Sequence, residues 1–224
     1  MAVIKEAYQL IKKELSNRNI KLVAVSKTKP IEEIQELYDL GQKDFGENYV
    51  QELVDKASQL PKDICWHYIG HLQTNKVKLI APFVQLIHGV DSLKLLKEIN
   101  KEGMKNNRVI DCLLQVHIAQ EETKFGLNEE ELNELISQSA NLKMNNIIIC
   151  GLMGMASFSE NGNLVREEFK KLKRIFDQYT KHQTSNIKLQ TLSMGMSSDY
   201  RIAAEEGSTM VRIGSLLFGE RSKM

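Results

Sequence analysis

The sequence predicts an α/β fold of the (β/α)8 TIM-barrel type with an extra helix at the N-terminus. Apolar runs alternate with stretches of helical periodicity, which indicates a parallel sheet. Eight strand-then-helix units follow the first helix, and eight units favour a closed barrel, with an open doubly wound sheet as the alternative. No linker or shift in composition divides the chain, so we expect residues 1–224 to form a single domain.

The first half of the chain contains the N-terminal helix and four of these units. Residues 1–15 form a charged amphipathic stretch that does not resemble a signal peptide. Residues 22–25 are continuously apolar, as expected for a strand buried on both faces. Pro30 begins the next helix and Gly41 ends it. Further strands are expected near 44–46, over 64–69 and over 84–90, with helices from about 50, from about 74 to Pro82, and after a cap at Asp91 or Ser92.

The second half contains four more units. Strands are expected over 109–118, 147–153, 187–193 and 210–213. Asn128 with Glu131 resembles a capping box at the start of a helix. An apolar stripe predicts a long helix, and a short one is expected over 199–206. The stripe consists of Val165, Phe169, Leu172, Phe176 and Tyr179.

Composition argues against several classes of function. The 30 basic and 29 acidic residues give a net charge of +1, which provides no electrostatic reason to expect nucleic acid as a partner. No apolar run approaches the roughly 20 residues that a membrane span needs. Cys65, Cys112 and Cys150 lie in apolar runs without CxxC spacing. We expect buried free thiols in a reducing, cytoplasmic compartment, and no metal site.

A barrel of this type places its site at the carboxyl ends of the strands. Lys27 draws attention there, because period-two geometry puts it on the same face as Val23 and Val25. A lysine that continues an apolar face either supplies a neutral amine for Schiff-base chemistry or extends its ammonium into solvent. The other strand ends carry Asn48, His71, Asp91, His117 and residues 154–157, 193–197 and 214–215.

Two loops combine glycine with serine just before a helix, at residues 193–198 and 212–215. Such loops after strands seven and eight often bind phosphate in barrels, although ordinary helix caps have the same composition. Arg212 interrupts the last apolar strand. A buried arginine must be paired, so it faces either a ligand or a structural partner. His67 and His88 lie inside strands, where histidines are usually core residues with satisfied hydrogen bonds.

Several motifs in order resemble the pyridoxal-phosphate-homeostasis family (the YggS and proline synthetase co-transcribed type). Each motif is only moderately specific, but the series covers nearly the whole chain. The barrel of this family is similar to the N-terminal domain of alanine racemase. The motifs are 24–30 (AVSKTKP), 45–52 (FGENYVQE), 66–76 (WHYIGHLQTNK), 88–92 (HGVDS), 192–197 (LSMGMS), 211–214 (VRIG) and 218–221 (FGER).

The resemblance implies a cofactor, pyridoxal 5'-phosphate (PLP), held as an internal aldimine on Lys27. It implies Asn48 as a further cofactor-binding residue and Arg212 beside the pyridine nitrogen. Phosphate contacts are implied for Ser193, Gly195, Gly214 and Ser215. The sequence departs from the family pattern at His117, where asparagine is common, and at 156–158, where a proline is common.

The leading hypothesis is a PLP-binding protein that buffers the cofactor or passes it to PLP-dependent apo-enzymes. We expect a monomer with no catalytic residues and without robust turnover, because arginine cannot accept a proton from the ring nitrogen as a carboxylate partner does. The alternative is an amino-acid racemase. Alanine racemase takes its second base from a C-terminal domain, and this chain ends soon after the eighth strand, so His71 or His117 would have to replace that base. A barrel that binds another phosphate ester is a third hypothesis.

Overall fold

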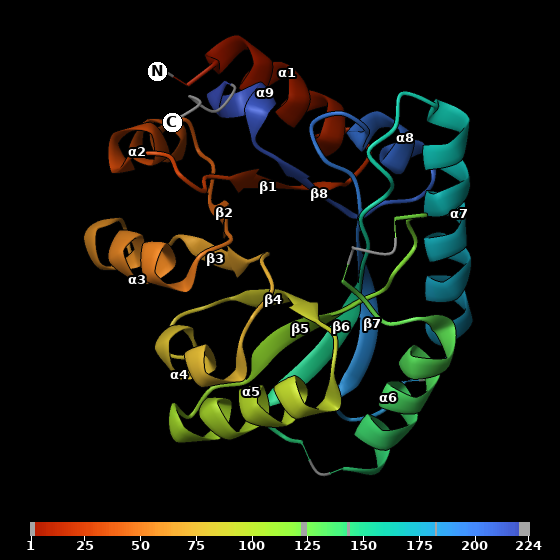
Figure 1. The fold of residues 1–224 in the computed structure, drawn as a ribbon. Coiled ribbons are helices and arrows are strands. Elements are labelled where there is room, and N and C mark those ends of the chain that lie inside the picture. The colour runs from red at the N-terminus through yellow and green to blue at the C-terminus, as the bar shows by residue number, and fades with distance from the viewer. Residues whose placement is uncertain (1–2, 122–124, 143, 182, 220–224) are drawn as a thin grey trace.

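Eight parallel strands close into a barrel and follow one another around it in chain order, as predicted (Figure 1). The structure is a computed structural model, and it describes residues 3–121, 125–142, 144–181 and 183–219. The first and last strands pair, with Val23 opposite Arg212, which closes the ring. The strands are β1 (Lys21–Val25), β2 (Asp44–Glu47), β3 (Cys65–Tyr68), β4 (Leu86–Val90), β5 (Ile110–Gln115), β6 (Ile147–Met153), β7 (Ile187–Ser193) and β8 (Met210–Ile213).

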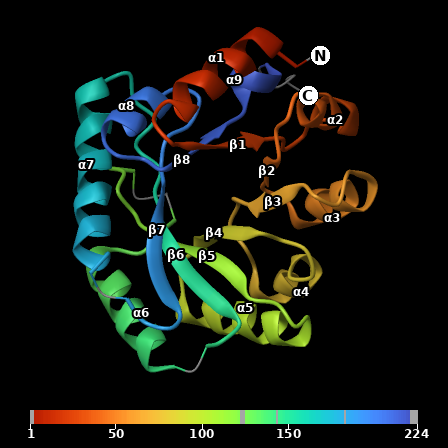
Figure 2. The ribbon, with the colours of Figure 1, turned by 180° about the vertical axis from the view of Figure 1, so that it is seen from behind.

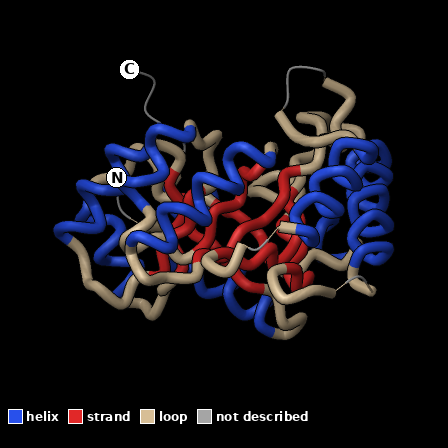
Figure 3. The backbone as a smooth tube through the Cα atoms, turned by 90° about the horizontal axis from the view of Figure 1, so that it is seen from below, coloured by secondary structure: helices blue, strands red, loops and turns tan. Residues whose placement is uncertain are grey.

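The helices form a layer outside the strands, which is clear from behind (Figure 2) and from below (Figure 3). The first helix lies against the last one, where the Ile4 N–H donates to the Leu217 carbonyl at 2.8 Å. The helices are α1 (Lys5–Ser16), α2 (Ile31–Asp39), α3 (Val50–Gln59), α4 (Val77–Ile80), α5 (Leu93–Lys105), α6 (Glu129–Asn141), α7 (Gly162–Tyr179), α8 (Tyr200–Glu205) and α9 (Ser215–Phe218), with a 3-10 turn, η1 (Thr74–Lys76), before α4.

Local sequence signals account for most of the helix boundaries. The capping box of Asn128 and Glu131 is present at the start of α6. Ser92, not Asp91, caps α5 by accepting from the Leu95 N–H. The segment from Thr74 begins as a 3-10 turn and becomes α-helical only at Val77, so the helix there is shorter than expected. The third and fifth strands are also shorter than the apolar runs that predicted them.

Two apolar layers hold the barrel. The larger one lies between strands and helices, where α7 buries its predicted stripe. The smaller one fills the barrel interior with Val23, Leu86, Leu113, Met153 and Met210. Among the described residues, no helix is long and apolar enough to cross a membrane. The three cysteines are free, and only Cys112 is fully buried, whereas Cys65 and Cys150 are partly exposed.

Candidate functional site

A pocket of about 550 Å³ opens at the carboxyl ends of the strands, within the size range of small-molecule sites. It brings together residues from both ends of the chain, because β1 pairs with β8. Five of the seven predicted cofactor-binding residues line it, and Ser193 and Gly195 do not. The lining residues are Val25, Lys27, Lys29, Asn48, Ile69, Met155, Phe158, Met196, Ser197, Ser198, Arg212, Gly214, Ser215, Leu216 and Gly219.

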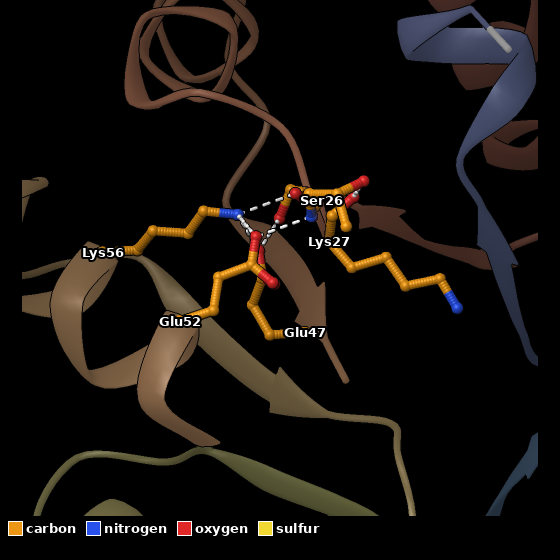
Figure 4. Close-up of polar contacts among 6 residues, drawn as sticks. Ser26, Lys27, Glu47, Glu52 and Lys56 are labelled. Atoms are coloured by element: carbon orange, nitrogen blue, oxygen red, sulfur yellow. Dashed lines mark hydrogen bonds and ion pairs between the residues drawn. The ribbon is translucent and has the colours of Figure 1, made fainter. Parts of the chain in front are cut away.

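Lys27 continues the inward face of β1, as the period-two argument predicted. Val23 belongs to the interior core, and Val25 and Lys27 both line the pocket. The lysine is partly buried, so its side chain lies in the pocket mouth and does not extend fully into solvent. Figure 4 shows the Lys27 side chain extending away from the polar residues Glu47, Glu52 and Lys56.

A turn directly after Lys27 fixes its direction. Thr28 has a φ of 63°, a left-handed conformation that is unfavourable for a β-branched residue. The Thr28 N–H donates to Glu52 Oε1 at 2.6 Å, and the Thr28 hydroxyl donates to the Lys27 carbonyl at 2.6 Å. These bonds stabilise the turn and direct the next residues away from the barrel axis.

A buried ionic cluster anchors this turn from α3 (Figure 4). Lys56 Nζ donates to the Ser26 carbonyl, Glu47 Oε1 and Glu52 Oε1 at 2.8, 2.8 and 2.7 Å. The Ser26 hydroxyl donates to the same Glu47 oxygen at 2.6 Å. Burial raises the pKa of Glu47, although Lys56 and Ser26 oppose that shift. The cluster holds the end of β1 from outside the barrel and leaves Lys27 on the inside.

Arg212 lies in the floor of the pocket with its guanidinium almost fully buried. It donates to neutral oxygens, the Ser193 carbonyl at 2.9 Å and the Gly154 carbonyl at 3.1 Å, as well as the Ser193 hydroxyl. Burial lowers the pKa of Arg212 to about 10, and the negative charge of Asp199 opposes the shift. The group is therefore a cation at neutral pH that faces the pocket.

Ser193 and Gly195, which the sequence predicts as phosphate contacts, are not among the residues that line the pocket. The Ser193 hydroxyl is completely buried and is engaged with Arg212 and His88. Gly195 has a φ of 98°, and a Cβ there would lie 2.6 Å from Ala203 Cβ, so glycine is needed for the packing of α8. The next residues of the same loop, Ser197 and Ser198, line the pocket in their place.

The loop after β8 completes this polar wall. Gly214 lies against the Val25 carbonyl, where a Cβ would be 3.1 Å away, and its N–H donates to Ser197 Oγ at 3.2 Å. Ser215 begins α9 and is exposed at the mouth. Together with Ser198, these groups present hydroxyls and backbone to the pocket, a set suited to an anionic group such as a phosphate.

Asn48 lies at the end of β2 on the same pocket. Its Oδ1 is buried and has no hydrogen-bond partner among the residues that the structure describes. Its carbonyl accepts from the Tyr68 hydroxyl at 3.0 Å and lies only 2.4 Å from where a Cβ on Gly70 would be. The backbone is therefore tightly held, and the side chain offers an unused acceptor to a ligand.

The two imidazoles considered for a racemase do not line the pocket. His71 is exposed, stacks on Phe125 and has Nδ1 3.4 Å from Asp91. His117 Nε2 lies 3.0 Å from the Glu121 carbonyl. Near the other departure from the family pattern, Ser157 donates to Glu168, and Phe158, 90% exposed, lies on the pocket rim.

Sequence reasoning missed two groups near the site. In the sequence, Lys56 reads as one of several charged residues on an amphipathic helix. Its (i, i+4) spacing from Glu52 is the one indication of an ion pair there. His67 and His88 are buried as expected but contact each other, with Nδ1 and Nε2 2.9 Å apart. The contact between His67 and His88 can be predicted from their inward positions on neighbouring strands only when the register of β3 and β4 is known.

Comparisons with known proteins identify the family of the chain. A family model described as the alanine racemase N-terminal domain matches residues 1–222. The pyridoxal phosphate homeostasis protein of Aquifex aeolicus is 46% identical over 202 residues, which cover 90% of this chain and 87% of the relative. The human protein of the same name is 40% identical over 211 residues, covering 90% and 76%. The structure of PipY from Synechococcus elongatus with PLP bound is 32% identical, has a TM-score of 0.86 and covers 96% of this chain and 99% of that one.

Proposed function

The chain belongs to the pyridoxal phosphate homeostasis family, and on that premise we propose that it binds PLP in the pocket of Lys27 and Arg212. PLP is a flat ring with a reactive aldehyde, a pyridine nitrogen and a phosphate. The single observation that carries the proposal is that Lys27, Arg212 and the serine loops of 197–198 and 214–215 line one pocket.

Lys27 is the residue that would hold the cofactor covalently. If PLP were bound there, its aldehyde would supply the electrophile, and the neutral Lys27 amine would condense with it with release of water. Lys29 lines the same pocket, but its Nζ donates to the Phe218 carbonyl at 2.6 Å and lies 3.9 Å from Glu33. Lys27 is the better candidate because it continues the inward face of β1, whereas the contacts of Lys29 hold its amine at the rim.

Arg212 gives the site its non-enzymatic character in this proposal. PLP enzymes that form carbanions generally protonate the ring nitrogen through an acidic partner. A guanidinium has only donors and cannot take up a proton, so it keeps the ring nitrogen unprotonated. We therefore propose that the protein stores and releases PLP without robust turnover.

The racemase alternative receives less support from the pocket. A racemase needs a second acid or base on the face of the substrate opposite the lysine. Among the described residues that line the pocket, none is a histidine, tyrosine, cysteine, aspartate or glutamate. Lys29 is the remaining titratable amine, and its contacts with Phe218 and Glu33 direct it to the rim.

Delivery of PLP to apo-enzymes and a monomeric state in the cytoplasm are also part of the proposal. The pocket opens at the barrel mouth, so another protein can approach its occupant. The exposed Phe158 and Leu216 lie on that rim. The free cysteines are consistent with a reducing compartment.

Absorption spectra with PLP, before and after borohydride reduction, test the proposal. We expect a visible band in the wild type and in Lys29→Met, and none in Lys27→Met. Mass spectrometry of the reduced protein should place the pyridoxyl group on the peptide that contains Lys27. The same band in Lys27→Met would contradict the covalent assignment. Binding of phosphate esters without any visible band would favour the third hypothesis instead.

A further inference from the structure

Five polar side chains form a continuous hydrogen-bonded chain inside the barrel. Asp44 Oδ1 lies 3.0 Å from His67 Nε2, and His67 Nδ1 lies 2.9 Å from His88 Nε2. His88 Nδ1 lies 3.2 Å from Ser193 Oγ, which accepts from Arg212 Nη1. These residues come from β2, β3, β4, β7 and β8, so the chain is visible only in the folded barrel.

The chemistry of the two ends determines the direction of every bond. Ionised Asp44 can only accept, so a neutral His67 must carry its proton on Nε2 and donate it to the Asp44 carboxylate. His67 Nδ1 then accepts from the Nε2–H of His88, and His88 Nδ1 accepts from the Ser193 hydroxyl. The Ser193 oxygen accepts from Arg212, which can only donate. With both rings neutral and Asp44 ionised, no other pair of tautomers preserves all four bonds.

Burial and charge keep both rings neutral. Burial lowers the pKa of His67, although Asp44 opposes the shift, and burial lowers the pKa of His88 well below its ordinary value, with His67 and Arg212 adding to the effect. Burial raises the pKa of Asp44, but its hydrogen bond with His67 and the charge of Lys21 outweigh this and lower the pKa overall. Asp44 therefore remains an acceptor at neutral pH.

The chain connects the two ends of the barrel. Arg212 lines the pocket of Lys27. His67 lines a second cavity, of about 640 Å³, whose wall includes Lys21, Leu86 and Met210. These three are the first residues of β1, β4 and β8, so this cavity lies at the opposite end. Asp44 is partly exposed there and lies 3.3 Å from Lys21.

We propose that Ser193, His88, His67 and Asp44 are positioning residues for Arg212. The one-directional chain engages Nη1 of the guanidinium, so that the N–H groups not used by Ser193 and Gly154 are presented to the ring of bound PLP. The inference rests on the proposed function and deepens it, because it assigns cofactor affinity to residues that do not touch the cofactor. Ser193 acts through Arg212 and not through the phosphate.

Nitrogen NMR of the apo protein, labelled at histidine, tests the chain without any cofactor. We expect His67 and His88 both to carry a single proton, on Nε2, in the wild type. Replacement of Asp44 by alanine removes the terminal acceptor and should release His67 from that tautomer. The conservative variant Asp44→Asn retains an acceptor oxygen and should preserve the wild-type pattern. A proton on Nδ1 of either ring in the wild type would overturn the assignment.

PLP titration then tests the effect on the cofactor. We expect His88→Phe and Ser193→Ala to bind PLP about tenfold more weakly, the cost of one or two hydrogen bonds. Asp44→Ala should be weakened several-fold and Asp44→Asn should recover the wild-type affinity. His71→Ala, an imidazole outside the chain, should bind like the wild type. Thermal melts identify variants that fail to fold. If His88→Phe is one of them, Asp44→Ala tests the positioning role instead, because Asp44 is partly exposed and its loss is less disruptive.

The two proposals fail differently. If the wild type binds no PLP, the proposed function is wrong, while the NMR result still decides the hydrogen-bonded chain. If the wild type binds PLP and the folded variants of Asp44, His88 and Ser193 bind it equally well, the positioning role is wrong and the proposed function is unaffected.

Discussion

The Thr28 N–H and Glu52 Oε1 are 2.6 Å apart, and this bond joins the turn after Lys27 to helix α3. The same carboxylate oxygen accepts from Lys56 Nζ at 2.7 Å. One glutamate on the outside of the barrel therefore stabilises both the left-handed turn and the buried ammonium beside it. The direction of the proposed cofactor lysine depends on a residue that lies outside its pocket.

Glu52→Leu removes this acceptor. The Thr28 N–H then loses its hydrogen bond, and Lys56 Nζ keeps only its bonds to Glu47 and the Ser26 carbonyl of the three described above. We expect PLP attachment at Lys27, measured as the rate of appearance of the visible band, to slow several-fold. Stability should fall by about 1–3 kcal/mol. Glu52→Gln retains an oxygen at the same place and serves as the control, with a smaller loss. Equal rates in Glu52→Leu and the wild type would show that the turn does not govern Lys27.

The buried pair of Glu47 and Lys56 should show strong coupling. Lys56→Met leaves the carboxylate of Glu47 buried without a counter-charge, which costs about 3–5 kcal/mol in urea unfolding. The double variant with Glu47→Gln should lose much less than the sum of the two single changes. Lys62→Met, whose ammonium contacts the Ala57 and Ser58 carbonyls at the surface, should change stability by less than about 0.5 kcal/mol. Additive losses in the double variant would contradict the pairing.

The two interior histidines predict how stability depends on pH. Their pKa values are lowered in the folded state from an ordinary value of 6.5, so below that pH the unfolded chain binds more protons than the folded one. Above pH 6.5 the two histidines should therefore not lower the free energy of unfolding. Below that pH the free energy of unfolding should decrease, by up to about 1.4 kcal/mol per pH unit for each histidine.

Urea unfolding of the apo protein at pH 7.5 and 5.5 measures this loss. A folded His88→Phe variant should show a shallower decrease over the same interval, because one titrating group is gone. His71→Ala provides the comparison, since its imidazole is exposed. An identical slope in the wild type and His88→Phe would show that His88 is not held neutral.

Gly195 should be intolerant of a side chain for structural reasons. Gly195→Ala combines a φ of 98° with a Cβ only 2.6 Å from Ala203 Cβ, and we expect a loss of about 1–3 kcal/mol. Gly162→Ala is the matched control, because its Cβ would meet Ile202 Cδ1 at an ordinary 3.6 Å. The loss should appear in apo unfolding experiments. Weaker PLP binding without any loss of stability would instead support Gly195 as a direct phosphate contact.

The sequence predicts the fold closely because its signals are local. The bounds of β6, β7 and β8 coincide with the predicted ranges, and the Asn128 cap is present. Period-two alternation also identifies the face of Lys27 correctly. The shortened β3 and β5 follow from hydrogen bonding, which ends a strand before its apolar run does.

The site is predicted less completely, because side-chain contacts depend on tertiary packing. Ser193 belongs to the same motif as Ser197, which lines the pocket, but Ser193 is the last residue of β7 and its hydroxyl is buried in the barrel interior. The contact between His67 and His88 requires the offset between β3 and β4, which apolar periodicity does not contain. Motifs therefore identify the loops, whereas packing decides which of their residues face the pocket.

The pairing of β1 with β8 has a consequence for synthesis. Lys27 emerges from the ribosome about 185 residues before Arg212 and Gly214, and all three line the pocket. A nascent chain that ends before β8 contains Lys27 but lacks Arg212, which forms the floor of the pocket. Only the closed barrel offers the complete pocket, so the pocket forms after β8 has paired with β1.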